Sequence, residues 1–375
     1  MAPRARAVIV GTGGIARAAH LPALRELAGR VELTGVVDVD PSSREAFASG
    51  SGAAAFASLP EALEAARPDL VILCTPPGLH AEHAELALGA GAWVLAEKPP
   101  CASLAEADAI LEAARAGGAQ FATVYQWRFG GGALQLRRLL AEGTIGPVLV
   151  AQCHTLWHRP DAYYALPWRG RWATEVGGPT VGHAIHAIDL LRHLLGPWEE
   201  VHAVMARRAR PIETEDVSLA TVRFEGGALA SLTSTVLAPR EQSWLRIDTP
   251  QATIELDRHW RGGDDWGLGI RAEHWRATER AGETDAPARV WPPPREPAHA
   301  GHAGVLADVL DAMRDGGVPS TGGASAFAAL ELLTGIYASA FSGRPVRRAE
   351  LGAGTPFHGS LRGADPRAAE AVLGA

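Results

Sequence analysis

The chain of 375 residues has little cysteine, no long apolar run and no basic block. Cys74, Cys101 and Cys153 are few, odd in number and widely spaced, which excludes a disulfide framework and a zinc knuckle. We therefore expect buried thiols in a reducing, cytoplasmic compartment. No apolar run reaches the roughly 18 residues that a membrane helix needs, and the start at Met1 leads into a strand-like run rather than a signal sequence.

Charge is balanced along the chain rather than concentrated. The formal net charge is −7, and residues of both signs are interspersed. No basic cluster predicts a nucleic-acid partner, and no polybasic or amphipathic stretch predicts a membrane surface. Hydrophobic residues make up 47% of the chain, so a large core can form, and the length predicts two domains.

The most informative run lies close to the first residue. Val8-Ile9-Val10 leads directly into Gly11-Thr12-Gly13-Gly14-Ile15-Ala16, and Asp38 closes the next apolar run. This order of strand, glycine turn, helix, strand and acid predicts a dinucleotide-binding site. Gly11 permits the tight turn, Gly13 lets the backbone approach a pyrophosphate, and the N-terminus of the helix faces the negative charge.

Asp38 predicts which nicotinamide cofactor is bound. Its carboxylate can accept hydrogen bonds from the adenosine ribose, and it would repel the 2′-phosphate of NADP. NAD is therefore the expected cofactor. Arg44 lies nearby in the sequence and leaves NADP open as the alternative.

Strand-like runs alternate with helical segments from Val8 to about Phe121, which predicts a parallel sheet with helices on both faces. The expected strands are Val8–Val10, Leu33–Val37, Leu70–Cys74, Trp93–Ala96 and Phe121–Val124. The expected helices are Ala16–Leu27, Pro60–Ala66, Ala81–Ala90 and Leu104–Ala116.

The pattern changes after Tyr125, where the sequence predicts a second domain. Strand-like runs follow one another with little helix between them, so we expect a mostly antiparallel sheet that carries helices on one face. The domains are expected at 1–124 and 125–375. The expected helices are Leu134–Glu142, Thr180–Leu195, His302–Arg314 and Ala324–Phe341, and the expected strands are Val148–Leu156, Val201–Ala206, Val217–Phe224, Ala228–Val236, Trp244–Asp248 and Ala252–Leu256. Residues 258–300 show no clear periodicity, and the chain after Gly352 is expected to be loosely ordered.

Two proline-containing segments follow strands of the first domain. Thr75-Pro76-Pro77 and Glu97-Lys98-Pro99-Pro100 lie at the carboxyl edge of the expected sheet, where open α/β folds bind ligands. Lys98 would point toward the cofactor crevice, where an oxidised nicotinamide disfavours its ammonium form and the amine can exchange a proton with a substrate hydroxyl. The alternatives are a rigid turn and an ordinary exposed lysine.

The helix predicted over 180–195 carries a polar stripe. His183, His186, Asp189 and His193 fall within an arc of roughly 120° at 100° per residue. The stripe indicates a cavity wall, in which Asp189 can orient the His186 ring. A metal site would need further ligands that the sequence does not supply, so no metal is expected. A structural histidine is the alternative, and we prefer it for His193.

Aromatic and arginine side chains gather in the segment 157–178. Tyr163, Trp168, Arg169 and Trp172 suit a polyhydroxylated ligand, because rings stack on sugar C–H faces and guanidinium groups bond to hydroxyls. The same residue types are enriched at domain and subunit interfaces, so packing remains an equal alternative.

Taken together, these motifs resemble the glucose–fructose oxidoreductase / inositol dehydrogenase (Gfo/Idh/MocA) family. The resemblance covers nearly the whole chain and depends on the order and spacing of its motifs. These are the Gly11–Ala16 turn, Thr75-Pro76-Pro77 with His80, Glu97-Lys98-Pro99, Tyr125-Gln126-Trp127-Arg128-Phe129, Gly177-Gly178, His186-Ala187-Ile188-Asp189 and Ser342-Gly343-Arg344-Pro345-Val346.

The resemblance implies a Rossmann domain followed by an α/β domain with a large open mixed sheet that forms homodimers or homotetramers. It implies hydride transfer between a nicotinamide and a secondary alcohol of a sugar, cyclitol or glycoside. Lys98 matches the active-site lysine of the family and His186 its histidine. Many members carry an aspartate four residues before that histidine, where this chain has Gly182, and the neighbouring His183 is the expected substitute.

The resemblance also assigns binding residues. Cofactor contacts are expected from Gly11, Thr12, Gly13, Gly14, Ile15, Asp38, Thr75, Pro76, His80, Glu97, Lys98 and Gln126. Substrate contacts are expected from Lys98, Arg128, Tyr163, Trp168, Arg169, Trp172, His183 and His186. Two other functions stay open: a lyase or glycosidase that retains NAD through transient sugar oxidation, and a non-catalytic module that senses a sugar or cofactor.

Overall fold

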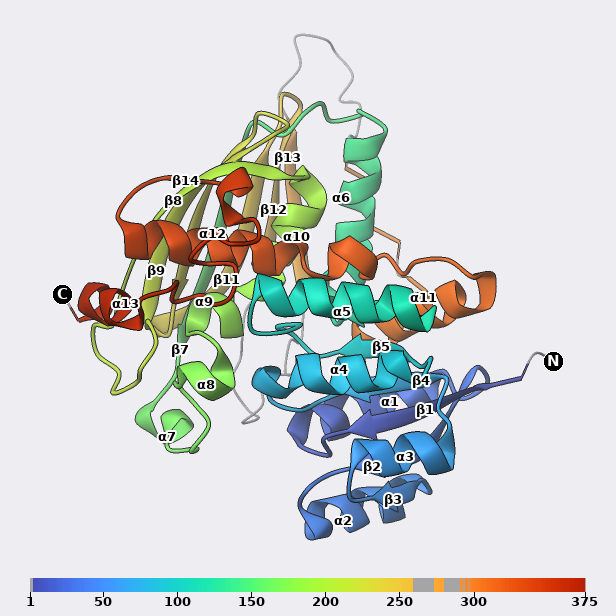
Figure 1. Cartoon of the computed structure of the whole chain (residues 1–375). Coiled ribbons are helices and arrows are strands. Elements are labelled where there is room, and N and C mark those ends of the chain that lie inside the picture. Colours follow the sequence, from blue (N-terminus) through green and yellow to red (C-terminus); the bar gives the residue numbers. More distant parts are fainter. Residues whose placement is uncertain (1–2, 259–272, 280–290, 293, 296, 375) are drawn as a thin grey trace. The chain divides into compact units, whose positions relative to one another are not determined.

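The computed structural model describes residues 3–258, 273–279, 291–292, 294–295 and 297–374. The chain forms two compact units (Figure 1). Unit 1 comprises Met1–Phe129 with Ala298–Ala328, and unit 2 comprises Gly130–Pro297 with Ala329–Ala375. The expected boundary after residue 124 assigned 298–328 to the second domain, whereas by contacts this segment lies with unit 1.

The segment 298–328 joins unit 1 because its helix supplies part of that unit's core. Helix α11 (Gly301–Asp315) buries Val305, Leu306 and Val309 in one apolar cluster of unit 1. The same cluster contains Ile9 of strand β1 (Ala5–Val10) and Leu24 of helix α1 (Leu21–Glu26). Contacts between residues so far apart in the sequence leave no local pattern. Composition alone therefore could not assign this helix to the first unit.

Unit 1 contains a six-stranded parallel sheet in the order β3-β2-β1-β4-β5-β6. Its central strands are continuous apolar runs because both faces are covered, and every residue of β4 is fully buried. The short outer strand β3 was not predicted, because Ala54 is exposed and the other two residues are only partly buried. The strands are β1 (Ala5–Val10), β2 (Val31–Val37), β3 (Ala54–Phe56), β4 (Leu70–Leu73), β5 (Trp93–Ala96) and β6 (Phe121–Thr123).

The helices of unit 1 follow the strands as predicted, with the addition of α2. Asp40, Ser58 and Ser103 each accept a backbone N–H at the start of a helix, which satisfies a group that the helix leaves unbonded. The helices are η1 (Ala16–His20), α1 (Leu21–Glu26), α2 (Pro41–Ser51), α3 (Leu59–Ala66), η2 (Pro77–Leu79), α4 (His80–Gly89), α5 (Leu104–Gly117), η3 (Gln126–Phe129), α11 and η4 (Gly323–Ala326).

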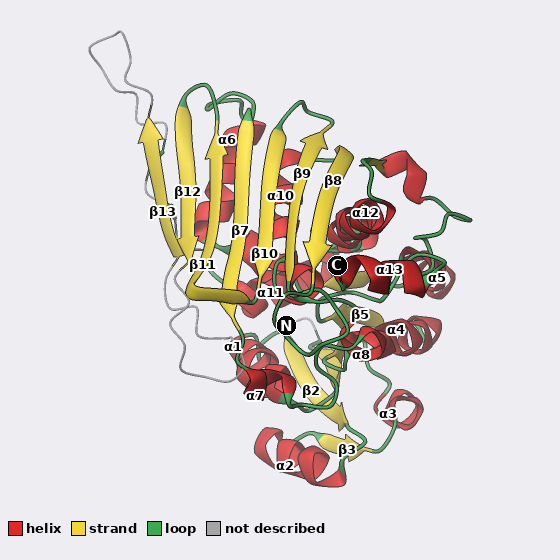
Figure 2. Ribbon diagram, turned by 90° about the vertical axis from the view of Figure 1, so that its left-hand side faces the viewer, coloured by secondary structure: helices red, strands yellow, loops and turns green. Residues whose placement is uncertain are grey.

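Unit 2 contains an eight-stranded mixed sheet in the order β13-β12-β11-β7-β10-β9-β8-β14. Strands β10 and β7 pair in parallel and the other neighbours pair antiparallel, which confirms the predicted mixed, mostly antiparallel sheet. Helices α6 (Gly131–Ala141) and α10 (Ile185–Leu195) lie behind the sheet in Figure 2, and α12 (Ala328–Ser342) lies beside β8. The strands are β7 (Val150–His158), β8 (Trp198–Ala206), β9 (Val217–Phe224), β10 (Leu229–Thr235), β11 (Leu237–Asp248), β12 (Ala252–Arg258), β13 (Glu273–Glu279) and β14 (Val346–Arg347).

The single helix predicted over 180–195 is wrong in one respect. The segment forms two helices, α9 and α10, and His183 lies at the break with φ −120° and ψ −50°. His183 therefore leaves the polar stripe, which holds only for the residues of α10. The helices of unit 2 are α6 (Gly131–Ala141), α7 (Asp161–Tyr164), α8 (Trp172–Glu175), α9 (Pro179–Gly182), α10 (Ile185–Leu195), α12 (Ala328–Ser342), η5 (Arg348–Leu351) and α13 (Pro366–Leu373).

The end of the chain is more ordered than predicted. Helix α13 is capped by Asp365, whose side chain accepts the N–H of Arg367, and Leu373 is fully buried. Residues 259–272 and 280–290, most of the stretch without periodicity, lie outside the described residues. In the described part of the chain, no helix has both the length and the apolar character required to cross a bilayer.

Candidate functional site

The glycine turn after β1 has the geometry that a dinucleotide needs. Gly11 adopts φ +91°, and a Cβ there would lie 2.8 Å from the backbone C and O of Cys74, so only glycine fits. A Cβ at Gly13 would meet nothing within 4 Å. The turn therefore presents open space above an exposed backbone, as a pyrophosphate cradle requires.

Asp38, at the end of β2, is held by hydrogen bonds to this turn. Thr12 donates its backbone N–H and its hydroxyl to Oδ2, each at 2.8 Å, and the N–H of Asp40 donates to Oδ1 at 3.0 Å. Burial opposes ionisation, but these bonds and the charge of Arg44 outweigh it and hold the pKa of Asp38 below its ordinary value. The carboxylate is therefore ionised and oriented at the position predicted to contact a ribose.

Arg44 hydrogen-bonds the backbone next to the predicted ribose-binding carboxylate. Its Nη1 donates to the backbone carbonyl of Asp38 at 2.8 Å. The guanidinium thus helps to fix the turn between β2 and α2, beside the Asp38 carboxylate.

His80 connects the two proline-containing loops. Its Nε2 lies 2.8 Å from the carbonyl of Thr75, and its Nδ1 lies 2.9 Å from the carbonyl of Pro99. Burial lowers the pKa of His80, so the ring is neutral and donates one of these bonds at a time. The fully buried ring fixes the loop after β4 against the loop after β5, which carries Lys98.

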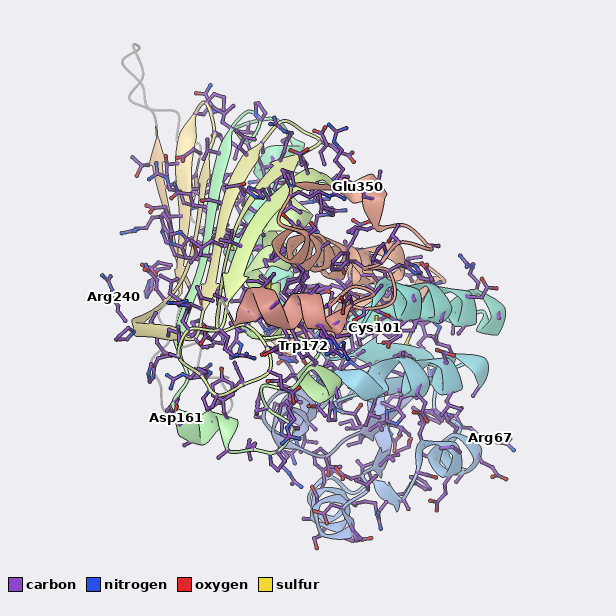
Figure 3. All side chains as sticks on the ribbon, turned by 60° about the vertical axis from the view of Figure 1, so that its left-hand side comes forward. Arg67, Cys101, Asp161, Trp172, Arg240 and Glu350 are labelled. Carbon is purple, nitrogen blue, oxygen red and sulfur yellow. The ribbon has the colours of Figure 1, made fainter. Side chains whose placement is uncertain are left out.

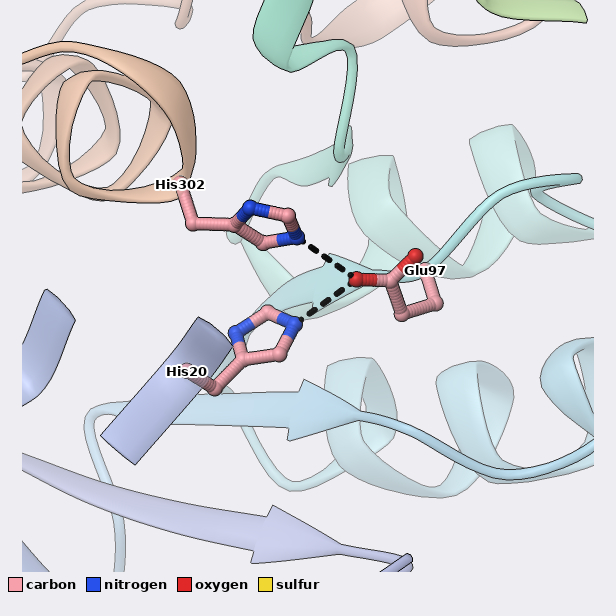
Figure 4. Close-up of side chains that lie close together, drawn as sticks. All are labelled: His20, Glu97 and His302. Carbon is pink, nitrogen blue, oxygen red and sulfur yellow. Dashed lines mark hydrogen bonds and ion pairs between the residues drawn. The ribbon is translucent and has the colours of Figure 1, made fainter. Parts of the chain in front are cut away.

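Glu97 binds two histidines inside unit 1. Its Oε1 lies 2.9 Å from Nε2 of His20 and 3.1 Å from Nε2 of His302 (Figure 4). Neither histidine was among the predicted site residues. His302 lies 205 positions away from Glu97 in the sequence, so no local pattern could have paired them.

The residues after β6 divide into an open and a structural group. Among the described residues, Oε1 of Gln126 is buried and has no hydrogen-bond partner, which fits a residue that awaits a ligand. Arg128 is buried, and its Nη1 donates to the carbonyl of Ser320 and the hydroxyl of Ser325 at 2.9 and 2.8 Å. Arg128 therefore anchors the loop before η4 within unit 1.

In unit 2, His183 lies beside a basic and aromatic cluster. The Nε of Arg159 donates to Nε2 of His183 at 3.3 Å, and the Trp157 ring meets the imidazole edge-on at 4.8 Å. Because Nε2 accepts, a neutral His183 ring carries its proton on Nδ1. The Tyr163 ring centre lies 6.1 Å away.

His186 and Asp189 lie one turn apart on α10, as predicted. The side chain of His186 is buried and Asp189 is fully buried. Lys98 belongs to unit 1 and His186 to unit 2, so the predicted meeting of the two side chains stays a prediction.

The predicted sugar-binding segment has internal contacts that favour its packing alternative. Arg169 bonds Glu175 at 2.5 Å and stacks on Trp168 and Tyr163 at 3.8 and 4.2 Å. The indole N–H of Trp172, labelled on α8 in Figure 3, donates to the carbonyl of Glu213. The polar groups of Arg169 and Trp172 thus hold this segment together.

Gly177-Gly178 has a steric explanation. A Cβ at Gly178 would lie 2.0 Å from the carbonyl oxygen of Glu215, and one at Gly177 would lie 2.5 Å from the Tyr337 hydroxyl. The buried Glu215 carboxylate accepts the N–H groups of Gly178 and Thr180 and the Tyr337 hydroxyl. Glu215 therefore fixes the start of α9, just before His183, and it was not predicted.

One compositional signal was overlooked. Lys98 is the only lysine of the chain, and the remaining residues among its 35 Lys and Arg are all arginine. A guanidinium stays protonated and cannot exchange protons near neutral pH, whereas an amine can. This single lysine follows the carboxyl end of β5, so an amine that can exchange a proton is present at this edge of the sheet.

Comparison with known proteins covers both units. Residues 5–125 match an oxidoreductase family with an NAD-binding Rossmann fold, and residues 133–255 match the GFO/IDH/MocA C-terminal domain. D-glucoside 3-dehydrogenase of Escherichia coli is 30% identical over 264 residues, which cover 64% of this chain and 73% of that protein.

Two further relatives extend the comparison. A putative UDP-kanosamine synthase oxidoreductase subunit of Amycolatopsis mediterranei is 38% identical over 197 residues, so the match spans about half of either chain (51% and 52%). The crystal structure of the WlbA dehydrogenase from Bordetella pertussis in complex with NADH and UDP-GlcNAcA has a TM-score of 0.78 and 27% identity. It covers 92% of this chain and 98% of that one.

Proposed function

Because the chain belongs to the Gfo/Idh/MocA family of NAD-binding oxidoreductases, we propose that it transfers a hydride between NAD and a secondary alcohol of a sugar, cyclitol or glycoside. The observation that carries the proposal is Lys98, the single lysine of the chain, at the carboxyl end of β5 beside the predicted cofactor crevice. The relatives that act on glucosides and sugar nucleotides support a sugar-like substrate.

The cofactor-binding role belongs to unit 1. Gly11, Gly13 and the start of η1 receive the pyrophosphate, and Asp38 accepts from the adenosine ribose. Gln126, with its unbonded amide oxygen, and the Thr75-Pro76 loop complete the cofactor side of the proposal. When bound, NAD accepts the hydride that leaves the carbinol carbon.

Lys98 and His186 handle the proton of the substrate hydroxyl. Lys98 polarises the hydroxyl or relays its proton, and His186 takes the proton as the carbonyl forms. His183, with the Arg159 and Trp157 groups beside it, supplies a further polar and aromatic surface for a polyhydroxylated ligand. The proposal requires units 1 and 2 to present Lys98 and His186 to the same substrate.

A substrate screen tests the proposal. Sugars, cyclitols, glycosides and sugar nucleotides are incubated with NAD or NADP, and reduced nicotinamide is followed by its absorbance. We expect turnover of at least one substrate class with NAD by the wild type, and loss of turnover in Lys98→Met with NAD binding retained. Full turnover in Lys98→Met would contradict the role of Lys98. Steady product formation without net NADH would instead establish the NAD-retaining lyase or glycosidase.

We also propose that the chain forms a homodimer or homotetramer in the cytoplasm. Large apolar residues lie exposed on neighbouring strands of the second sheet, and a second copy of the chain would cover them. They are Val150, Val204, Leu219 and Leu229. The three free cysteines fit a reducing compartment. Light scattering coupled to size-exclusion chromatography tests the oligomer, and a monomer at micromolar concentration would contradict it.

A further inference from the structure

Three segments of unit 1 meet at the Glu97 carboxylate (Figure 4). His20 comes from η1, His302 from α11, and Glu97 from the end of β5. Both imidazoles direct Nε2 at the same oxygen, Oε1. Because a carboxylate only accepts hydrogen bonds, each ring carries a proton on Nε2 and each acts as a donor.

The other carboxylate oxygen is bonded as well. The backbone N–H of Lys98 donates to Oε2 of Glu97 at 3.3 Å. The carboxylate therefore has three donors, and the third belongs to the residue that carries the amine. Any movement of the Glu97 carboxylate would break or strain this hydrogen bond to the backbone N–H of Lys98.

These donors keep the carboxylate charged inside the fold. Only 9% of the Glu97 side chain and 3% of the His20 side chain are exposed. Burial alone would raise the pKa of Glu97, but the hydrogen bonds from His20 and His302 outweigh it and hold the pKa well below its ordinary value. Burial lowers the pKa of His20, so this ring donates in its neutral form.

The charge acts on neighbouring elements. With burial, it raises the pKa of the Cys74 thiol after β4. It also opposes the burial that lowers the pKa of His80 on α4. In the described part of unit 1, the titratable groups that interact with the Glu97 carboxylate are Cys74, His80, His20 and His302, and Lys98 follows Glu97 in the chain.

We propose that His20 and His302 are positioning residues, which hold Glu97 as a fixed negative charge one residue before Lys98 and thereby favour the ammonium form of the chain's single lysine. The consequence for catalysis rests on the proposed function of Lys98. The effect on the amine itself does not, because it is present in the protein without cofactor or substrate.

The single lysine makes the effect measurable. Reductive methylation with ¹³C-formaldehyde labels two amines, Lys98 and the chain N-terminus. They titrate in separate ranges, because the ordinary pKa is about 10.4 for a lysine amine and about 7.7–8.0 for an α-amino group. We expect Glu97→Gln to lower the pKa of Lys98, followed by NMR, by about one. A nearby opposite charge shifts a pKa by about 1–3 in favour of the charged form, and loss of that charge reverses the shift.

A pair of His302 variants tests whether the histidine acts through Glu97. His302→Leu removes a donor, whereas the amide of His302→Gln can replace Nε2. We expect His302→Leu, which lets the Glu97 side chain move away from the backbone of Lys98, to lower the pKa of Lys98 in the wild-type background and to have no further effect in the Glu97→Gln background. His302→Gln is expected to leave it unchanged. His299→Leu is the matched control, because His299 pairs with Glu26 and not with Glu97.

The outcomes separate the proposal from its alternatives. An unchanged pKa of Lys98 in Glu97→Gln would overturn it, as would equal shifts from His302→Leu in both backgrounds. If Glu97→Gln does not fold, the contrast between His302→Leu and His302→Gln carries the test. One nitrogen of each histidine and one oxygen of Glu97 lie within 4.8 Å of one another, which is close enough to hold a metal ion. Cobalt(II) is therefore titrated as a probe. If the wild-type chain binds one ion and His302→Gln does not, the cluster is a metal site and the hydrogen-bonded arrangement is overturned. Full turnover in Lys98→Met would contradict the proposed role of Lys98 in catalysis. It would leave unchanged the pKa values of Lys98 measured in the Glu97 and His302 variants.

Discussion

Thr12 donates both its backbone N–H and its hydroxyl to one carboxylate oxygen of Asp38, each at 2.8 Å. The Thr12 hydroxyl also lies 2.7 Å from the hydroxyl of Ser43 at the start of α2. The glycine turn, the end of β2 and α2 are thus joined through one carboxylate. Its orientation is fixed before any ribose is bound.

Substitution of Asp38 should weaken the preference for NAD. In Asp38→Ala, we expect kcat/KM with NAD to fall at least about tenfold, because a hydrogen bond to a charged group is worth about 1.5–3 kcal/mol. The loss with NADP should be smaller, since the carboxylate no longer repels a 2′-phosphate. Steady-state kinetics with both cofactors measure the ratio. Asp40→Asn, which keeps an acceptor at the start of α2, is the control and should leave the ratio unchanged.

Substitution by alanine should destabilise the protein at Gly178, just before α9, far more than at Gly182, the last residue of α9. At Gly178 the added Cβ would lie 2.0 Å from the carbonyl oxygen of Glu215, whereas at Gly182 it would meet nothing within 4 Å. We expect Gly178→Ala to reduce the free energy of unfolding by at least about 2 kcal/mol. Gly182→Ala should change it by less than about 1 kcal/mol. Urea unfolding monitored by tryptophan fluorescence compares the two, and equal losses would contradict the steric argument.

The sequence located the parts of the site that depend on local pattern. Gly11, Asp38 and Lys98 follow apolar runs, so their positions at strand ends were predictable, and the structure of unit 1 confirms those strands. The helix break before α10 was missed although Gly182, a poor helix former, lies directly before it. His183 lies at that break, so a helical wheel could not place it.

Contacts between segments far apart in the sequence could not be predicted from hydrophobic periodicity or motifs. His302 meets Glu97, and Glu215 fixes Gly178, through packing that no local periodicity records. The overlooked signal was one of composition, because a chain with a single lysine marks that residue without any alignment.

Acid should destabilise the protein partly through His20. Burial lowers the pKa of His20 in the folded state below the ordinary value of 6.5. A group with a depressed folded pKa contributes stability that is present above the unfolded pKa and is lost as pH falls. We therefore expect Tm to fall as pH drops below about 6.5. The fall should be smaller in His20→Gln, whose amide can still donate to Glu97 but does not titrate.

Differential scanning fluorimetry between neutral and mildly acidic pH measures this slope. His299→Gln is the control, because this partly exposed ring pairs with Glu26 outside the buried cluster. It should retain the wild-type slope. Identical slopes for His20→Gln and the wild type would show that the charge of His20 is not what acid titrates.

The Lys98→Arg variant separates charge from proton exchange. Arginine retains the positive charge and the hydrogen-bond donors but cannot release a proton near neutral pH. If Lys98 only attracts the substrate, Lys98→Arg should remain active. If it exchanges a proton, as we expect, kcat should fall at least about 100-fold, the lower range for general acid–base catalysis, while the Kd for NAD changes little. Arg115→Lys, at an exposed pair with Glu112 on α5, introduces an amine elsewhere and should leave both constants unchanged. Near-wild-type turnover in Lys98→Arg would mean that the site needs the charge alone, and the lone lysine would then have no chemical explanation.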